Sequence, residues 1–277
     1  MITASVVLYN TPAREAETIL KSFAPGPERK LFFIDNSPSF HEELTFLKSL
    51  EHVEYIFTGE NLGYGKANNL GIEKAVSEGA DYHVVLNPDL QFEPSIIDEL
   101  VTYADAHPDV VYMLPEVLNE EGEVQRLCKL LPTPADLILR RFFPQKGVFA
   151  RSNDRYTLAD SGYDRIIDPP CLSGCFMFMR VHTLEEHALR FDERFFMYCE
   201  DFDLIRRLHR IGRTIYYPEV HITHRESKAS YKNGKMLAAH IASACRYFNK
   251  YGWFRDPERD RMNRKILDEL KKAGEGK

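Results

Sequence analysis

The segment Tyr82-His83-Val84-Val85-Leu86-Asn87-Pro88-Asp89 decides the predicted fold. Residues 82–86 form a short, mostly apolar run with β-branched valines, which predicts a buried β-strand. The segment from Pro94 to Tyr103 has the pattern of a helix. Asp89 therefore follows the carboxyl end of a strand, which is where open α/β sheets bind their ligands.

Two interpretations fit the Asn87-Pro88-Asp89 sequence. A carboxylate at this position is well placed to hold Mg²⁺ or Mn²⁺ against a diphosphate, because these ions prefer oxygen ligands and share them with phosphates. Asn-Pro-Asp is also good turn chemistry without any ligand. The rest of the sequence has to decide between a metal site and a simple turn.

Strand and helix patterns alternate along the first half of the chain. Strands are predicted at residues 3–9, 31–34, 53–57 and 82–86, and helices at 12–23, 41–50 and 66–78. This alternation predicts a parallel sheet with helices on both faces, and right-handed connections place the carboxyl ends of its strands at one edge. A further strand is predicted at residues 110–118, followed by a hairpin turn at Glu121-Gly122.

Polar residues from four strand ends meet at this predicted edge. They are Asn10, Asp35, Asn36, Asn61 and Asp89. Gly63 and Gly65 begin a helix and can offer backbone amides to an anion. The first strand-to-helix turn, residues 9–12, contains no glycine, so a dinucleotide-binding Rossmann domain is poorly supported. The edge nevertheless predicts a ligand site.

The composition is that of an ordinary globular protein. Its 277 residues are 44% hydrophobic and 28% charged, and the net charge of −6 gives no reason to expect a nucleic acid polymer as partner. Five scattered cysteines and the absence of a secretory pattern predict a reduced, cytoplasmic protein. Cys171 and Cys175 lack a second pair at zinc-site spacing, and no apolar run approaches the ~20 residues of a transmembrane helix.

Basic and apolar residues occur together in two segments. Residues 126–151 carry six Lys and Arg residues against one Asp, which fits either a membrane- or acceptor-facing insertion or a loop packed on the sheet. From Arg246 to the end, 10 basic residues face 6 acidic ones, beside Tyr251, Trp253 and Phe254. This tail suits either a membrane interface or packing against the rest of the protein.

Three acidic residues cluster at positions 200, 201 and 203, just before a helix predicted at 204–211. They can complement the helix dipole, but three acids after an aromatic run exceed what a cap requires. Mutual repulsion also raises the pKa of a carboxyl toward the range of a general base. Asp203, directly before the helix, is predicted to cap it.

In this order, the motifs resemble those of the inverting family 2 glycosyltransferases, which have a GT-A fold, and most closely the bacterial rhamnosyltransferase-like branch. The matching segments are Val6–Asn10, Ile34–Ser37, Asn61–Gly71, Leu86–Asp89, Ser173–Phe176, Phe191–Leu204 and His224. The resemblance implies an α/β, Rossmann-like, mostly parallel sheet flanked by helices in residues 1–230. Residues 1–118 are then the nucleotide-sugar-binding half, 119–230 the acceptor and catalytic half, and 231–277 a C-terminal helical, basic-aromatic extension.

The resemblance also implies a role for each matching residue. Asp89 stands where the family has the Asp-x-Asp metal motif, with Asn87 in place of the first acid, and His224 matches a position that completes the metal or diphosphate site. Asp201 matches the catalytic base, with Glu200 beside it. The residues expected to bind the nucleotide-sugar are Tyr9, Asn10, Asp35, Asn36, Asn61, Gly63, Lys66, Asn68, Asn69, Asn87 and Asp89.

These roles imply an inverting glycosyltransferase that depends on a divalent metal, Mg²⁺ or Mn²⁺. Direct displacement at the anomeric carbon needs a base for the acceptor hydroxyl and stabilisation of the leaving diphosphate, but no enzyme nucleophile. The expected donor is dTDP-rhamnose, with UDP-galactofuranose and UDP-N-acetylhexosamine as alternatives. The expected acceptor is a growing bacterial surface polysaccharide or lipid-linked glycan.

The expected location is the cytoplasm, with peripheral contact to the inner face of the cell membrane. A rival hypothesis is a non-catalytic module that binds a nucleotide-sugar without turning it over. Asp89, Asp201 and His224 argue against this rival, because a binding module has no need of a base or of a site that stabilises a leaving diphosphate. Hydrolysis or transfer of the donor distinguishes the two.

Overall fold

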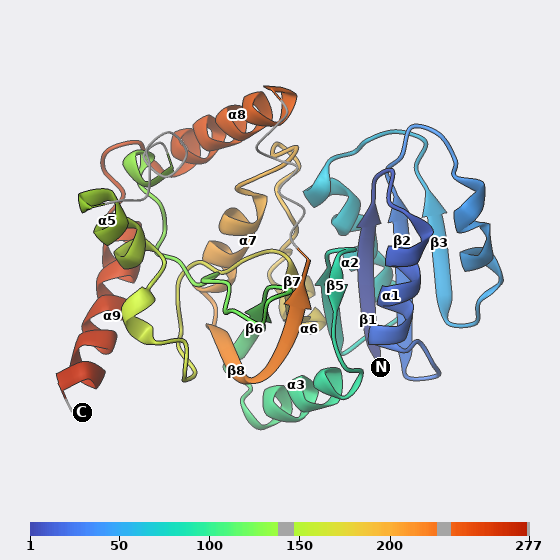
Figure 1. Cartoon of the computed structure of the whole chain (residues 1–277), viewed down its shortest axis with the longest axis horizontal. Coiled ribbons are helices and arrows are strands. Elements are labelled where there is room, and N and C mark those ends of the chain that lie inside the picture. Colours follow the sequence, from blue (N-terminus) through green and yellow to red (C-terminus); the bar gives the residue numbers. More distant parts are fainter. Residues whose placement is uncertain (138–146, 226–233, 276–277) are drawn as a thin grey trace.

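An eight-stranded sheet forms the centre of the computed structural model, which describes residues 1–137, 147–225 and 234–275 (Figure 1). The strands lie in the order β3-β2-β1-β4-β7-β6-β8-β5. The first half of the chain contains β1 (Ile2–Leu8), α1 (Ala13–Phe23), β2 (Arg29–Asp35), the 3-10 helix η1 (Glu42–Ser49), β3 (Val53–Phe57), α2 (Tyr64–Ser77), β4 (Tyr82–Leu86), β5 (Leu90–Gln91) and α3 (Ser95–Ala106).

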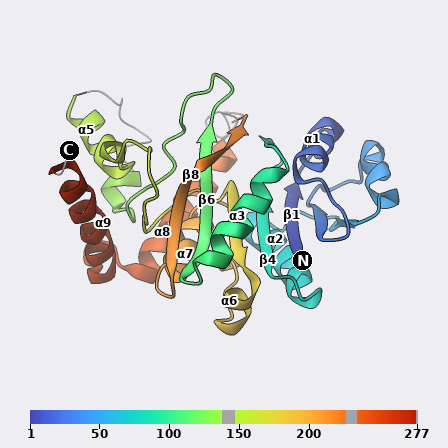
Figure 2. The ribbon, with the colours of Figure 1, turned by 90° about the horizontal axis from the view of Figure 1, so that it is seen from below.

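The second half completes the sheet and adds helices at its far end. Its elements are β6 (Val110–Leu118), α5 (Val148–Tyr156), the 3-10 helix η2 (Ala159–Ser161), β7 (Phe176–Arg180), α6 (Val181–Glu186), α7 (Glu200–Leu208), β8 (Arg213–His224), α8 (Gly234–Tyr251) and α9 (Pro257–Glu275). Helices α8 and α9 lie at the end of the molecule away from β3 (Figure 2).

The sheet is mostly parallel, as the alternating strand and helix patterns predict. β1, β2, β3 and β4 pair in parallel, as do β6 and β8, whereas β7 is antiparallel to both of its neighbours and β5 is antiparallel to β8. In the β4–β7 pair, Leu86 lies opposite Phe176. The carboxyl end of β4 and the residues before β7 therefore lie at the same edge of the sheet, which is the predicted site edge.

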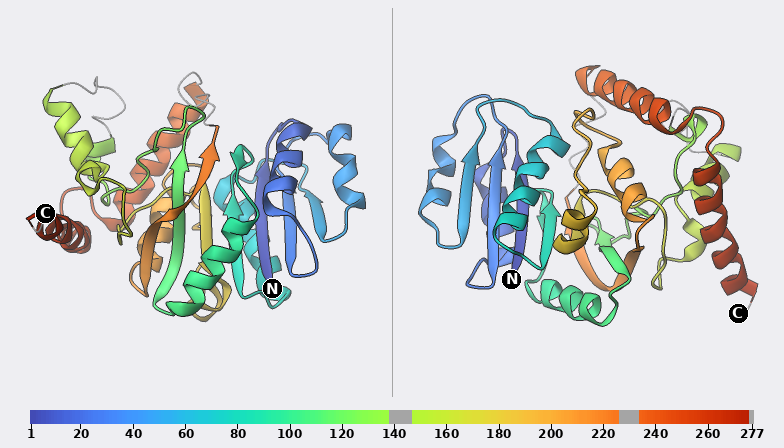
Figure 3. Two further views of the ribbon diagram at one scale, coloured as in Figure 1. Left: turned by 60° about the horizontal axis from the view of Figure 1, so that its bottom comes forward. Right: turned by 180° about the vertical axis from the view of Figure 1, so that it is seen from behind.

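The core sits on both faces of this sheet. Strand β2 is the continuous apolar run expected of a doubly covered strand, and Phe32, Phe33 and Ile34 are fully buried. Helices α2, α6 and α7 lie together on one face, with α1 on the opposite face (Figure 3). His83 is a structural residue in this core, because its ring nitrogens lie 2.9 and 3.0 Å from the hydroxyls of Thr3 and Ser5.

Two predictions about local structure are wrong. Helix α7 begins at Glu200 rather than at residue 204, so the three acids lie inside its first turn. Asp203 is consequently not a cap; the capping position is Cys199, which has a left-handed backbone (φ 64°) and makes no capping bond with its side chain. The helix predicted at residues 41–50 is present as the 3-10 helix η1 (Glu42–Ser49). The basic segment 126–151 lies partly outside the described residues.

Candidate active site

A cavity of about 640 Å³ opens at the predicted edge of the sheet. It is formed by the loops that follow β1, β4 and β8, by the residues that precede β7, and by the first turn of α7. Segments far apart in sequence meet here because parallel strands deliver their carboxyl ends to one edge. The predicted site residues that line the cavity are Tyr9, Asn10, Asn87, Asp89, Glu200, Asp201 and His224.

Asp89 and His224 face each other across the β5–β8 pairing. The short strand β5 places Leu90 opposite His224, and the Arg225 amide donates to the Asp89 carbonyl at 3.0 Å. The His224 Nε2 and Asp89 Oδ1 atoms are 3.2 Å apart, and their side chains are only 11% and 19% exposed. Nevertheless, their geometry makes no hydrogen bond, so the buried Oδ1 has no hydrogen-bond partner in the described part of the chain.

Gln125 orients the ring of His224. The Gln125 amide nitrogen donates to the His224 carbonyl at 3.0 Å, which turns its amide oxygen toward Nδ1 at 3.3 Å. In the tautomer that donates from Nδ1 to this oxygen, Nε2 carries a lone pair on the side of the Asp89 carboxylate. In that tautomer, His224 and Asp89 together can bind a cation.

The residues present fit a Mg²⁺ or Mn²⁺ ion that shares its ligands with a phosphate. Within residues 1–137, 147–225 and 234–275, no third acid, histidine or cysteine joins Asp89 and His224. A dedicated all-protein cage is thus not formed. Mg²⁺ sites commonly use one or two protein ligands and take the rest from water and substrate phosphate oxygens, so the two side chains suffice.

Glu200 and Asp201 form a second polar pair on the cavity wall. Burial, reinforced by the Asp201 charge, raises the pKa of Glu200 to about 8, and its Oε2 atom has no hydrogen-bond partner among the described residues. Burial also raises the pKa of Asp201, against the opposing charge of Lys129. Glu200, the more buried of the two, is therefore the carboxyl that holds a proton at neutral pH.

The backbone around Asp201 is shaped to hold its carboxylate. Its two oxygens accept from the backbone amides of Gly174 at 3.2 Å and Phe202 at 2.9 Å. A side chain at position 174 would bring its Cβ within 2.9 Å of the Asp201 Cβ, so only glycine permits this approach. Asp201 is partly exposed whereas Glu200 is buried, which makes Asp201 the member of the pair that a ligand can reach.

Tyr64 lines the cavity, although the sequence analysis assigned it no role. Its hydroxyl lies 3.1 Å from the Asn87 side-chain oxygen and 2.7 Å from the Gly174 carbonyl, so it links the loop after β4 to the loop before β7. Burial raises the pKa of Tyr64 well above its usual range, so the phenol stays neutral. The signal was its position inside the Asn61–Gly65 loop, at the start of α2.

Arg225 is a second residue that sequence reasoning missed. Its Nε and Nη2 atoms are buried in the cavity wall without a hydrogen-bond partner among the described residues. A guanidinium with unused donors is suited to bidentate binding of phosphate oxygens. The available signal was its position directly after His224, where β8 delivers it to the same edge as Asp89.

Several predicted binding residues lie beside the cavity and shape its loops. Asp35 accepts from the Ser37 amide at 2.9 Å and from the Tyr55 hydroxyl, and the Asn36 amide donates to the Gly63 carbonyl at 3.1 Å. The Asn61 side chain accepts from the Gly63 amide at 3.0 Å. Lys66 is exposed and lies 3.9 Å from Glu193.

Asn68 and Asn69 do not fit their predicted role in direct donor binding. Both are buried, and both amides are used by the protein itself. Asn68 accepts from Ser5 at 3.1 Å and donates to the Tyr64 carbonyl at 3.1 Å. Asn69 binds the backbone of Phe191 twice, at 2.8 and 3.0 Å. Asn69 therefore positions the segment that leads to Glu200 rather than contacting a ligand.

Comparison with known protein families identifies the family to which this chain belongs. Residues 5–184 match the family described as Glycosyl transferase family 2, which is more than half of the chain. The chain is a family 2 glycosyltransferase. The matched range includes the loops after β1 and β4 and the residues before β7, while α7, His224 and Arg225 lie beyond it.

Relatives of this glycosyltransferase include named rhamnosyltransferases. It is 28% identical over 270 residues to the N-acetylglucosaminyl-diphospho-decaprenol L-rhamnosyltransferase of Mycobacterium tuberculosis (strain ATCC 25618 / H37Rv), covering 92% of this chain and 87% of the relative. It is 25% identical over 214 residues to the rhamnosyltransferase WbbL of Escherichia coli (strain K12), covering 70% and 73%. The chain is thus a rhamnosyltransferase-like member of its family.

Solved structures share the fold of this glycosyltransferase. The structure of S. aureus TarS 1–349 in complex with UDP-GlcNAc superimposes with a TM-score of 0.60 at 12% identity, covering 96% of this chain and 71% of that one. The predicted GT-A fold is therefore confirmed. In the described parts of this chain, none of the helices combines the length and the apolar character needed to span a bilayer.

Proposed function

We propose that this glycosyltransferase moves L-rhamnose from dTDP-rhamnose, with inversion, onto a growing bacterial surface polysaccharide or a lipid-linked glycan. One observation carries the proposal: Asp201 and the buried Glu200 line the same cavity as Asp89 and Arg225, and among the described residues Glu200 Oε2, Asp89 Oδ1 and Arg225 Nε and Nη2 have no hydrogen-bond partner. The cavity thus combines a base with groups for a diphosphate. The names of the relatives from M. tuberculosis and E. coli support rhamnose as the sugar.

Asp89, His224 and Arg225 bind the leaving diphosphate in this proposal. A divalent cation held by Asp89 and His224 would supply Lewis-acid stabilisation of the developing negative charge. Arg225 donates its unused Nε and Nη2 hydrogens to phosphate oxygens, which places a second positive charge on the leaving group. Asn10 and Tyr9, at the end of β1, line the same cavity and contact the donor.

Asp201 is the proposed general base. It accepts the proton of the acceptor hydroxyl as that oxygen attacks the anomeric carbon and the bond to the diphosphate breaks. Glu200 supports it by carrying the shared proton at neutral pH, because burial and the Asp201 charge raise the pKa of Glu200 to about 8. The Gly174 amide holds the Asp201 carboxylate in place.

Two alternatives remain as outcomes of the test. UDP-galactofuranose or a UDP-N-acetylhexosamine replaces dTDP-rhamnose in the first, which the TarS complex with UDP-GlcNAc supports at the level of the fold. In the second, the protein binds a nucleotide-sugar without reaction. The buried Glu200 Oε2 atom, which has no hydrogen-bond partner among the described residues, disfavours a mere binding module, because such an atom costs stability.

The proposed division of the chain follows the same roles. Residues 1–118 hold the donor, residues 119–230 the acceptor side and the base, and residues 231–277 form the C-terminal extension. This extension also provides a peripheral contact to the inner face of the membrane, supported by Phe254 (93% exposed) and Trp253 (38% exposed) beside exposed Arg246 and Arg255. Tyr251 takes no part in this contact, because its hydroxyl binds Asp203.

A donor screen tests the proposed function. Thermal-shift measurements with dTDP-rhamnose, UDP-galactofuranose and UDP-GlcNAc, each with and without Mn²⁺, should show the largest stabilisation for dTDP-rhamnose with metal. The selected donor is then followed for release of its nucleoside diphosphate. Stabilisation by a UDP-sugar alone would replace the donor assignment, and binding without any release of nucleoside diphosphate would favour the non-catalytic module.

A further inference from the structure

The residues directly before Glu200 have an unusual backbone. Tyr198 and Cys199 are consecutive non-glycine residues with positive φ angles of 70° and 64°. Such conformations are sterically costly and persist only where the surrounding structure imposes them. The orientation of Glu200 and Asp201 after this turn therefore depends on the contacts that keep the turn in place.

Helix α8 of the C-terminal extension packs directly on this strained turn. The fully buried Ser243 donates its hydroxyl hydrogen to the Met197 carbonyl at 2.7 Å. Tyr247 and Phe248 form a small apolar cluster with Phe195 and Cys199. Residues just before the turn, and Cys199 within it, thus contact residues of one helix that lie more than 40 positions further along the sequence.

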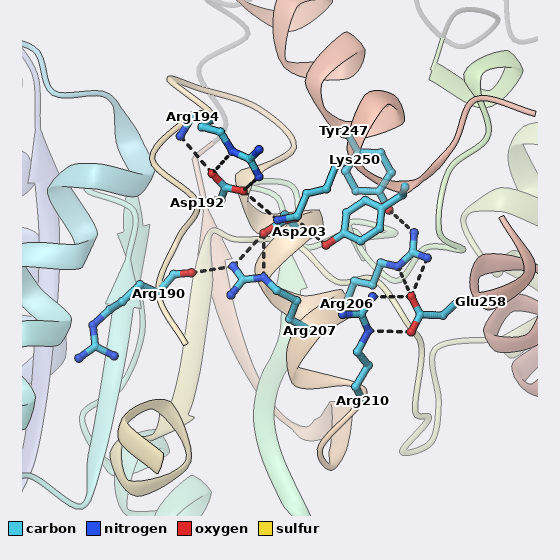
Figure 4. A network of polar contacts seen from close by, with 11 residues as sticks. Arg190, Asp192, Arg194, Asp203, Arg206, Arg207, Arg210, Tyr247, Lys250 and Glu258 are labelled. Atoms are coloured by element: carbon cyan, nitrogen blue, oxygen red, sulfur yellow. Dashed lines mark hydrogen bonds and ion pairs between the residues drawn. The ribbon is translucent and has the colours of Figure 1, made fainter. Parts of the chain in front are cut away.

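A second set of contacts joins α8 to α7 in the same turn as the two acids (Figure 4). The Asp203 carboxylate is fully buried and accepts hydrogen bonds from the Lys250 ammonium and from the Tyr251 hydroxyl at 2.7 Å. Arg207, on α7 itself, donates to the same carboxylate at 2.9 Å. Lys250 also donates to Asp192 at 2.8 Å and so ties the preceding segment to the same point.

We propose that α8 is a positioning element for the Glu200–Asp201 pair, with Ser243 and Lys250 as the positioning residues. This inference rests on the proposed function, because it assumes that the pair acts as the base. Neither Ser243 nor Lys250 lines the cavity, so both act through the turn and through α7 rather than on a substrate. A displacement of about 1 Å at a reacting group can cost roughly 10²-fold in rate, so a modest loosening of α8 should be visible in turnover.

The test compares full-length Lys250→Met and Ser243→Ala variants with the wild-type enzyme. Turnover of dTDP-rhamnose should fall roughly tenfold or more in Lys250→Met and detectably in Ser243→Ala, while the donor Kd from calorimetry stays within about twofold. Lys250→Arg, which keeps the charge, should recover most of the turnover. Lys265→Met is the matched control, since Lys265 also joins a C-terminal helix to a carboxylate, Asp168 at 3.3 Å, and should leave turnover unchanged.

A titration of the Glu200 carboxyl provides a readout that does not need turnover. Loosening of α8 admits water and lessens the burial that raises the pKa of Glu200, so the Glu200 NMR signal should titrate at lower pH in Lys250→Met. Loss of the Lys250 charge alone would raise the pKa of Glu200 instead. A fall in this pKa therefore shows that α8 has moved, and a rise shows only the loss of the charge. Glu200→Gln assigns the signal.

The outcomes separate this inference from the proposed function. An unchanged Glu200 titration in Lys250→Met, together with wild-type turnover or with only a lower melting temperature, would overturn the positioning role. Normal transfer by Asp201→Asn and by Glu200→Gln would overturn the proposed base, whatever α8 does. A Glu200 titration that moves to lower pH in Lys250→Met would still support the role of α8 in that case.

Discussion

The cavity and the polar network that joins α7 to the C-terminal helices through Asp203 and Arg206 both bury charged side chains. The two regions differ in whether these side chains have hydrogen-bond partners. In the cavity, Asp89, Glu200 and Arg225 each keep at least one buried polar atom without a hydrogen-bond partner in the described part of the chain. In the network, every nitrogen of the Arg206 guanidinium donates to Asp256, Glu258 or Tyr247. Both Asp203 oxygens accept hydrogen bonds.

Helix α7 carries both kinds of acid within a single turn. Glu200 at its start keeps its Oε2 atom without a hydrogen-bond partner among the described residues, while both Asp203 oxygens accept hydrogen bonds three residues later. A buried polar atom without a partner costs stability, so its retention points to chemistry, whereas a fully paired charge is part of the architecture. Substitutions in the cavity should therefore lower activity, and substitutions in the network should lower stability.

Replacement of Asp89 by Ala should produce the largest loss of activity. Without its carboxylate the site loses the proposed metal contact, which is worth several kcal/mol of transition-state stabilisation, or roughly 10³-fold in rate. The melting temperature should stay near wild type, because the removed Oδ1 atom had no hydrogen-bond partner. Assays of transfer at several Mn²⁺ concentrations measure the effect, and unchanged turnover would contradict the metal site.

The matched control for Asp89 is an exposed aspartate. Asp98→Ala removes a carboxylate that is 68% exposed and paired with Arg29 at the surface. This variant should keep wild-type turnover and lose at most about 1 kcal/mol of stability. Equal loss of activity in both aspartate variants would mean that the cavity carboxylate has no special role.

Replacement of Arg206 by Met should show the reverse pattern. It leaves the buried Asp256 carboxylate without the guanidinium that pairs with it, because the Arg206 and Asp256 side chains are only 1% and 4% exposed. Breaking such a pair typically costs about 3–5 kcal/mol of unfolding free energy. Urea unfolding measures it, with Arg213→Met as control, because the Arg213–Asp109 pair at 3.4 Å is exposed and should contribute at most about 1 kcal/mol.

Replacement of Arg225 by Met should weaken the binding of a diphosphate without lowering stability. A charge-assisted hydrogen bond contributes about 1.5–3 kcal/mol, so the Kd for dTDP should rise roughly 10- to 150-fold. Isothermal calorimetry measures this, and Arg213→Met again serves as the control. If dTDP binds both variants equally, Arg225 is not part of the diphosphate site, and its unused donors need another explanation.

Replacement of Phe254 by Ser should have the smallest effect and tests the proposed membrane contact. Phe254 is 93% exposed, so the change should not alter folding. Insertion of one Phe side chain into a bilayer interface contributes at most about 2 kcal/mol, so sedimentation with anionic vesicles should weaken by tenfold or somewhat more. Ile211→Ser, at a 38% exposed site, is the control. Equal sedimentation of Phe254→Ser and the wild type would remove Phe254 from the proposed contact.

The sequence predicted the strands and the edge at which they meet, because their apolar runs record local burial. It did not predict the start of α7, since Glu200 begins the helix after a turn on which the distant helix α8 packs. The capping role of Asp203 was wrong for the same reason. No local sequence pattern predicts that Lys250 pairs with the Asp203 carboxylate.

The sequence predicted which cavity residues lie at the ends of strands. For residues elsewhere in the chain, the prediction of the site was incomplete. Asp89 and His224 meet because β5 pairs with β8, a contact between two strand ends that the motifs anticipated. Asn68 and Asn69 belong to the matching loop, but they face inward on α2 and bind backbone instead. Their helical position alone did not show which side of α2 would be buried. The sequence shows Arg225 as a basic residue directly after a strand. Only the packing shows that its Nε and Nη2 atoms have no hydrogen-bond partner among the described residues.

The central claim is that the two adjacent acids at the start of α7, Glu200 and Asp201, provide the base of a glycosyl transfer. The most direct measurement is turnover of the selected donor by Asp201→Asn and Glu200→Gln, with donor affinity measured in parallel by calorimetry. Asp201→Asn keeps the shape but removes proton affinity, so turnover should fall ~10²–10⁴-fold while the donor Kd stays near wild type. Since a base must be deprotonated, wild-type turnover should rise with pH along an acid limb. Normal transfer by both variants would contradict the account, and loss of activity in Glu200→Gln alone would exchange the two roles.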